Sequence, residues 1–161
     1  MDIKEFFLKQ KEAIHKGDLS VFGKIPPDRL DWKPADGLLT LGELARHVWT
    51  SEDGLRRIAL GGDWSYFEAR IPHGLHAVLG ETRSLSEELE HIEKTHRETL
   101  REAGEFPLER WDEERVHEGL KMRRRISVLL FAINEHHIHH RAQAGVYLRI
   151  LTGERASPYE L

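Results

Sequence analysis

The chain has 161 residues, of which 39% are hydrophobic and 32% are charged, and its formal net charge is −4. This length predicts one domain, 1–161, with a core of its own. The mild negative charge and a pI of about 6.3 argue against nucleic acid or an anionic membrane as a partner. No apolar run is long enough to span a bilayer and the N-terminus lacks a signal-peptide pattern, so we expect a cytoplasmic protein.

The absence of cysteine limits the chemistry of any site. No disulfide can hold the fold, and no side-chain thiolate can bind a metal or attack a substrate. A transition-metal site would therefore consist of imidazole, carboxylate and water. Thiol chemistry would need a thiol supplied by a cosubstrate.

The N-terminal part predicts two helices. The first covers about 2–16, where apolar residues recur on one face, and Gly17 is its expected stop. A proline-containing loop then leads to a capping box of Thr40 and Glu43. This box starts the second helix, which is predicted over about 41–60.

The next segment, 61–83, is a long connection rich in aromatic residues and glycine. Connections of this length are typical of a binding loop or lid, here with room for a short helix. A second capping pattern at Ser84 starts a third helix over about 85–103, with Gly104 as its cap.

The C-terminal part predicts an irregular segment over 105–123, with a small hairpin around Glu118-Gly119. The last helix follows over about 124–152 and ends at Gly153. Four amphipathic helices without a convincing sheet predict an all-α four-helix bundle. The long connections leave room for a topology other than simple up-and-down.

Histidines in the last predicted helix are the strongest chemical signal. Four of the chain's eleven histidines lie between positions 136 and 140. His136 and His140 are four residues apart, so they share a helix face and can ligate one metal ion. His47 lies beside the apolar face of the second helix and can supply a third ligand. Three imidazoles with a position left for solvent form the usual pattern of a catalytic metal site.

Packing is the competing interpretation of these histidines, because an inward histidine is more often a hydrogen-bonded core residue than a ligand. His137 competes with His136 for the inward position, and periodicity does not separate the two. The i,i+4 relation to His140 favours His136. His96 is expected to lie in the core or to line a pocket.

Four segments carry a resemblance to a known family, and they are Leu30–Pro34, Leu41–His47, Glu135–Gln143 and Tyr147–Pro158. Together they resemble the DinB/YfiT-like superfamily of four-helix-bundle metalloproteins, in the right order over nearly the whole chain. The resemblance implies a divalent metal held by one histidine of the second helix and an H-x-x-x-H pair of the last. Here these residues are His47, His136 and His140.

Two positions depart from the family pattern. Ala142 stands where the family often has glycine, and this change favours helix formation. His137 stands where other members often have glutamate, which leaves a general base at that position in doubt.

The resemblance implies an enzyme, because relatives include thiol-dependent transferases and isomerases and putative hydrolases, beside members without an assigned activity. Our first interpretation is a metal-dependent enzyme that transfers a low-molecular-weight thiol to a small electrophile or hydrolyses a small substrate. Zinc or nickel is the expected metal, with iron also possible. The alternatives are a non-catalytic metal-binding stress-response bundle and a structural helical dimer whose histidines merely pack.

Aromatic residues offer weaker signals. Trp49, Trp64 and Tyr66 are candidates for substrate binding, although aromatic residues at such positions more often belong to the core. We also expect a homodimer, with Phe6, Phe7 and Trp49 as spare apolar surface.

Charged residues suggest no further site. The run Arg123–Arg125 is expected to pair with Asp112–Glu114, with an anion-binding patch as the alternative. Glu52 and Asp53 are expected on a solvated face.

Overall fold

The computed structural model describes residues 1–159. It contains helices α1 (Ile3–Phe22), α2 (Leu41–Arg56), α3 (Ser65–His73), α4 (His76–Leu79), α5 (Leu85–Glu105) and α6 (Ile126–Thr152). A π-helical turn η1 (Arg57–Gly61) extends α2, a 3-10 turn η2 (Leu108–Arg110) follows α5, and strands β1 (Glu114–His117) and β2 (Met122–Arg125) form a hairpin. The predicted all-α four-helix bundle is confirmed.

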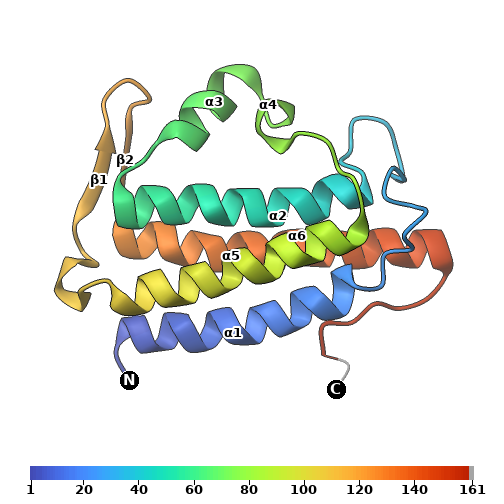
Figure 1. Cartoon of the computed structure of the whole chain (residues 1–161), viewed down its shortest axis with the longest axis horizontal. Coiled ribbons are helices and arrows are strands. Elements are labelled where there is room, and N and C mark those ends of the chain that lie inside the picture. Colours follow the sequence, from blue (N-terminus) through green and yellow to red (C-terminus); the bar gives the residue numbers. More distant parts are fainter. Residues whose placement is uncertain (160–161) are drawn as a thin grey trace.

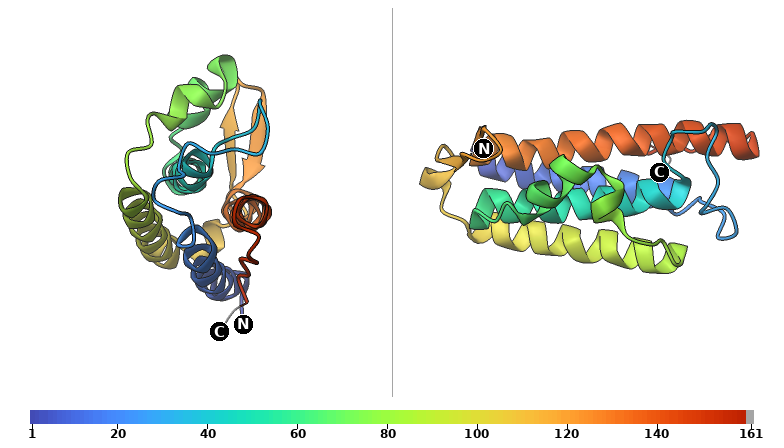
Figure 2. Two further views of the ribbon diagram at one scale, coloured as in Figure 1. Left: turned by 90° about the vertical axis from the view of Figure 1, so that its right-hand side faces the viewer. Right: turned by 90° about the horizontal axis from the view of Figure 1, so that it is seen from above.

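The bundle consists of α1, α2, α5 and α6, seen end-on in Figure 2. Helices α1 and α2 each pack against both α5 and α6, so they occupy opposite corners. Figure 1 shows α1 and α6 running one way and α2 and α5 the other. Because α2 and α5 are parallel, the chain must travel back along the bundle between them. The return segment carries α3 and α4 and lies over α2 (Figure 1).

Local signals predicted several helix ends correctly. The Thr40 hydroxyl accepts from the Glu43 amide, and the Glu43 carboxylate accepts from the Thr40 amide, as predicted. Gly153 ends α6 with φ 76°, also as predicted.

The predicted stop at Gly17 is wrong, because α1 continues to Phe22. A Cβ at Gly17 would collide with the guanidinium of Arg141. The glycine therefore serves the packing of α1 against α6 rather than ending the helix. Gly104 likewise lies inside α5, whose cap is Phe106.

The predicted hairpin is confirmed and places the arginine run in β2 rather than at the start of the last helix. Glu114 lies opposite Arg125 in the register, and Lys121 at the turn has φ 52°. Arg123 pairs with Glu114 at 2.6 Å, and Arg125 lies 3.6 Å from Asp112. Two of the three arginines thus pair with the expected acids, whereas Arg124 donates to the Arg123 carbonyl and Glu113 pairs with Arg110.

Two apolar clusters fill the bundle. One surrounds Leu44 and Leu148, and the other surrounds Phe7 and Leu130. Between them the inward positions are polar, and the buried side chains there include Lys11, Asp18, His47, Glu52, Thr95, His96, Asn134, His137 and Arg141. Functional groups thus occupy the middle layer of the bundle.

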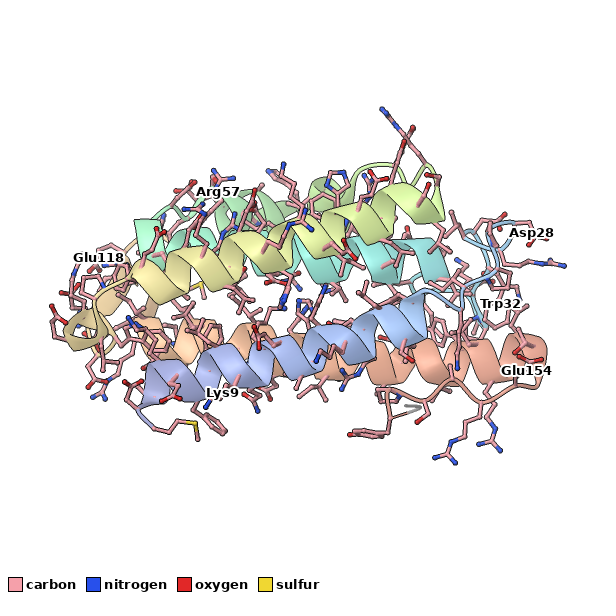
Figure 3. All side chains as sticks on the ribbon, turned by 60° about the horizontal axis from the view of Figure 1, so that its bottom comes forward. Lys9, Asp28, Trp32, Arg57, Glu118 and Glu154 are labelled. Carbon is pink, nitrogen blue, oxygen red and sulfur yellow. The ribbon has the colours of Figure 1, made fainter. Side chains whose placement is uncertain are left out.

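The outer surface is charged. Figure 3 shows labelled side chains such as Lys9 and Arg57 extending away from the helices, with 65% and 51% of these side chains exposed. Among the described residues, no helix combines the length and apolarity needed to cross a membrane.

Candidate metal centre

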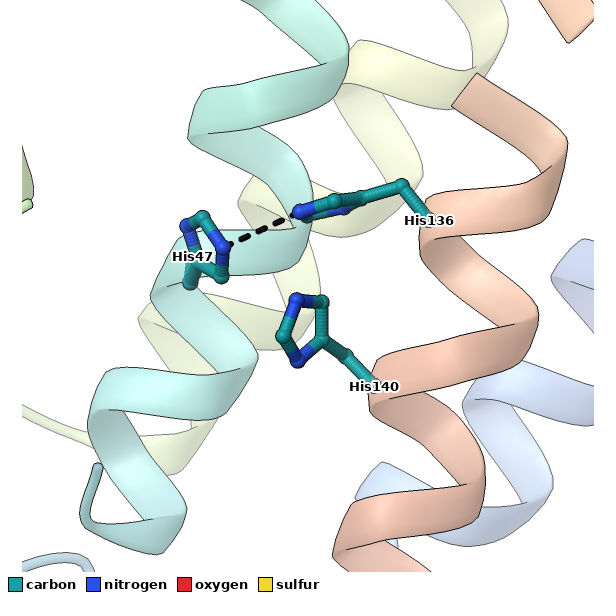
Figure 4. A group of neighbouring side chains, drawn as sticks. All are labelled: His47, His136 and His140. Carbon is teal, nitrogen blue, oxygen red and sulfur yellow. Dashed lines mark hydrogen bonds between the residues drawn. The ribbon is translucent and has the colours of Figure 1, made fainter. Parts of the chain in front are cut away.

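Three histidines converge in the middle layer (Figure 4). His47 comes from α2, and His136 and His140 come from adjacent turns of α6. One ring nitrogen from each lies within 4.8 Å of the others. The Nε2 atoms of His47 and His136 are 3.0 Å apart. His47 is buried, whereas His136 and His140 are half-buried and so partly accessible to solvent.

The spacing of the nitrogens suits a metal ion. Imidazole nitrogens bind zinc at about 2.0–2.1 Å, so two ligands at angles of 90–110° stand roughly 2.9–3.4 Å apart. The 3.0 Å between the Nε2 atoms of His47 and His136 falls in this range. Without an ion, the same two nitrogens share a hydrogen bond, with the proton on one of the two rings (Figure 4). The three residues can therefore hold a divalent ion and leave positions for other ligands.

A hydrogen bond on the far side of the His140 ring sets which of its nitrogens faces the centre. His140 Nδ1 lies 3.0 Å from Gln143 Oε1, which only accepts, so Nδ1 carries the proton and Nε2 keeps its lone pair. Gln143 in turn donates to the Tyr147 hydroxyl at 3.0 Å. His47 Nδ1 lies 3.1 Å from the Ser51 hydroxyl. Such partners orient metal-binding imidazoles and raise their basicity.

The three imidazoles are neutral near pH 7. Burial lowers the pKa of His47 to about 3, and the charges of His140 and Arg70 add to the effect. Burial, with His47 and His140, lowers the pKa of His136 to about 2. Burial also lowers the pKa of His140. Metal binding requires the neutral form, so protonation competes only in acid.

The metal-free protein should lose stability between pH 7 and pH 5. Folded His47 and His136 stay neutral there, whereas the unfolded chain binds protons near the reference pKa of about 6.5. The unfolded state is therefore favoured by up to about 2 kcal/mol per imidazole at pH 5, less for the partly exposed His136. Urea unfolding of chelator-treated protein at both pH values measures this loss.

A variant carrying His47→Gln and His136→Gln provides the control. It should lose clearly less stability over the same pH range. The raised pKa of His137 acts in the opposite sense, but it is common to both proteins and cancels. An equal loss in the two proteins would show that these imidazoles are not the cause.

His137 faces away from the three histidines and joins a buried charged layer. Its Nδ1 lies 2.7 Å from Asp18 on α1, and its Nε2 lies 2.8 Å from Glu52 on α2, off the direction of a linear hydrogen bond. Burial and Lys11 disfavour its charge, but Glu52 and Asp18 outweigh them and raise the pKa of His137. Apolar periodicity did not separate His136 from His137 as the metal-facing residue. In the structure His136 faces His47 and His140, and His137 faces Asp18 and Glu52.

The same layer corrects the prediction for Glu52. Its side chain is fully buried rather than solvated, and Lys11 on α1 donates to it at 2.9 Å. Arg141 on α6 lies 3.5 Å from Asp18 and donates to the Ile14 carbonyl at 2.9 Å. The layer ties α1, α2 and α6 together beside the histidines. Burial raises the pKa of Glu52, but the charges of Lys11 and His137 outweigh burial and lower it below its usual value. Glu52 is therefore charged.

The remaining histidine of interest, His96, lies outside the group. It is 7% exposed and stacks on His15 with ring centroids 3.7 Å apart. This position matches the expected core or pocket-lining role.

The three aromatic candidates lie at different distances from the centre. Trp64 is buried in the apolar cluster around Phe7. Trp49 donates to Glu88 at 2.7 Å and stacks on His91, on the side of α2 that faces α5. Only Tyr66 connects to the histidines, since its hydroxyl lies 2.9 Å from the Ser51 hydroxyl.

Sequence reasoning missed four polar residues, two beside the candidate metal ligands and two in the buried charged layer. Ser51 and Gln143 follow His47 and His140 by one helical turn, a spacing that can reveal such partners. Lys11 and Asp18 lie on the inward side of α1 among apolar residues. A charged residue at an inward position was a usable signal, but its partners on other helices were not visible in the sequence.

Comparison with known proteins supports the fold. The family model described as DinB superfamily matches residues 19–144. A crystal structure of a DinB-like protein from Bacillus subtilis superposes with a TM-score of 0.70 at 21% identity, covering 99% of this chain and 96% of that one. No curated protein matches the chain. The family match spans well over half of the sequence and includes His47, His136 and His140. The chain belongs to the DinB superfamily.

Proposed function

We propose that the chain is a metal-dependent enzyme that transfers a low-molecular-weight thiol to a small electrophile, with hydrolysis of a small substrate as the second reaction to test. His47, His136 and His140 hold a divalent ion, with zinc or nickel as the first candidates. The observation that supports this proposal is the convergence of three neutral imidazoles, two of them half-buried, with no fourth protein ligand beside them among the described residues. A divalent ion held there supplies Lewis acidity towards water or a thiol.

The nucleophile comes from outside the chain in this proposal. The sequence has no cysteine. Ser51 is buried, and its hydroxyl is engaged by His47 and Tyr66, so it is poorly placed to attack a substrate. The role of the protein is then to orient two small molecules and to exclude water, which the α3–α4 segment over α2 is positioned to do.

A panel of thiols and electrophiles tests the proposal. Activity should disappear when a chelator removes the metal and should return when the metal is added back. Mass analysis after denaturing quench should show no covalent adduct on the protein during turnover. An adduct on a side chain would contradict an external nucleophile. Stoichiometric metal without any turnover would favour the non-catalytic metal-binding bundle.

We also expect a homodimer, on a smaller surface than the sequence suggested. The prediction for Phe7 is wrong, because it is fully buried. Trp49 is engaged by Glu88 and His91, whereas Phe6 is 45% exposed and Ile3 beside it is 48% exposed. Light scattering should give a mass near twice 18.7 kDa. A mass near 18.7 kDa at high protein concentration would rule the dimer out.

A further inference from the structure

Arg70 on α3 belongs to the surroundings of the metal centre. Its guanidinium carbon lies 6.0 Å from the ring centroid of Tyr66, one turn earlier on α3. The Tyr66 hydroxyl lies 2.9 Å from the Ser51 hydroxyl, which contacts His47 Nδ1 at 3.1 Å. A continuous chain of contacts therefore links Arg70 to a candidate metal ligand.

The position of α3 over α2 is fixed by a close approach. Gly54 of α2 lies under Tyr66, and a Cβ there would stand 2.5–2.9 Å from the Tyr66 side chain. Only a glycine leaves room for the ring to lie on the α2 backbone. The ring in turn sets where Arg70 lies relative to the three histidines.

Arg70 is half-buried, so water screens its charge less than that of a fully exposed residue.

Arg70 has no carboxylate partner in residues 1–159, and the acids near it in sequence are engaged. Asp63 pairs with Arg57, and Glu68 lies 2.8 Å from His117. Other shielded arginines do have partners, since Arg46 binds Glu88 and Arg56 binds Glu98. The three histidines are neutral, so a bound divalent ion and Arg70 would together give the site three positive charges. No carboxylate contacts this group in the described part of the chain, so the site favours an anionic ligand.

We propose that Arg70 is a specificity residue that binds the carboxylate of a small substrate or cosubstrate whose other end reaches a metal ion held by the three histidines. A planar guanidinium matches one carboxylate with two parallel hydrogen bonds, which a single arginine can supply. This inference rests on the proposed function, because it needs an open position beside His47, His136 and His140.

Two pairs of probes test it on cobalt-loaded protein by calorimetry and by the visible spectrum of the metal. The thiol pair is 3-mercaptopropionate and 2-mercaptoethanol, and the thiol-free pair is succinate monohydroxamate and acetohydroxamate. In each pair only the first member carries the extra carboxylate. The proteins are the wild type, Arg70→Gln and the charge-matched control Arg83→Gln, whose arginine is exposed and outside the site.

The wild type and Arg83→Gln should bind each carboxylate probe about 10-fold or more tightly than its neutral partner. In Arg70→Gln this preference should fall below about twofold, while the neutral probes bind as in the wild type. Arg70→Lys should restore part of the preference.

The outcomes separate the two proposals. Equal binding of both members of a pair by the wild type, or a preference that survives in Arg70→Gln, overturns the role of Arg70 and leaves the metal centre standing. If neither thiol binds, thiol transfer fails, and the hydroxamate pair still decides the role of Arg70. If no probe binds to metal-loaded protein, there is no open position and both proposals fail.

Discussion

Protein carrying both His136→Ala and His140→Ala will be purified with far less than one metal ion per chain. Two of the three imidazoles that converge within 4.8 Å are then missing, and His47 alone cannot hold a divalent ion at ordinary concentrations. Even residues that only orient metal ligands change affinity by about 10–100-fold, so loss of a ligand should exceed that. Metal analysis of protein made without a histidine tag measures the effect.

His139→Ala is the matched control, because His139 lies in the same helix but is exposed and outside the group. It should keep the metal content of the wild type. Circular dichroism should show that the double variant remains helical, since neither ligand is fully buried. A double variant that keeps one ion per chain would disprove the assignment.

Glu52→Leu will be the most destabilising single change in the charged layer. It leaves Lys11 buried without its 2.9 Å partner and removes one of the two carboxylates beside His137. Removing one member of a buried ion pair typically costs about 3–5 kcal/mol, because the remaining charge is not solvated. Urea unfolding of the metal-free proteins at pH 7 measures the loss.

Two further variants test whether the loss of stability in Glu52→Leu comes from the buried charges. Asp53→Leu changes the neighbouring acid, which is partly exposed at the surface, and should cost less than about 1 kcal/mol. The double variant Lys11→Met, Glu52→Leu removes both charges and should recover much of the loss. If Glu52→Leu is no worse than Asp53→Leu, the buried layer does not stabilise the fold as described.

The elements of the fold were readable from local signals. Apolar periodicity and the capping residue Thr40 predicted the bundle helices, because these signals act within a few residues along the chain. The extent of α1 was not readable, because Gly17 packs against Arg141, which lies more than a hundred residues away in sequence. The same helix contributes Lys11 and Asp18, whose partners are on other helices.

The histidines show the same division. The i,i+4 spacing of His136 and His140 is local and was decisive once α6 was recognised as a helix. The role of His137 depended on Asp18 and Glu52, which periodicity along α6 cannot reveal. The prediction of a solvated Glu52 failed for the same reason, since its neighbour Asp53 is indeed partly exposed and only the tertiary packing separates the two.

The segment over α2 has a consequence for how molecules reach the histidines. Helix α3 has no fully buried side chain, so lifting it from α2 exposes less apolar surface than unfolding a bundle helix does. Its free energy of local opening should therefore be far below that of unfolding the bundle, and its amide hydrogens should exchange much faster than those of α2. Tyr66 and Arg70 leave with it. Opening of α3 should enlarge the access that the half-buried His136 and His140 already have, while the bundle that holds them stays folded. The entry rate of a ligand should then depend on the opening of a few residues rather than on the stability of the whole protein.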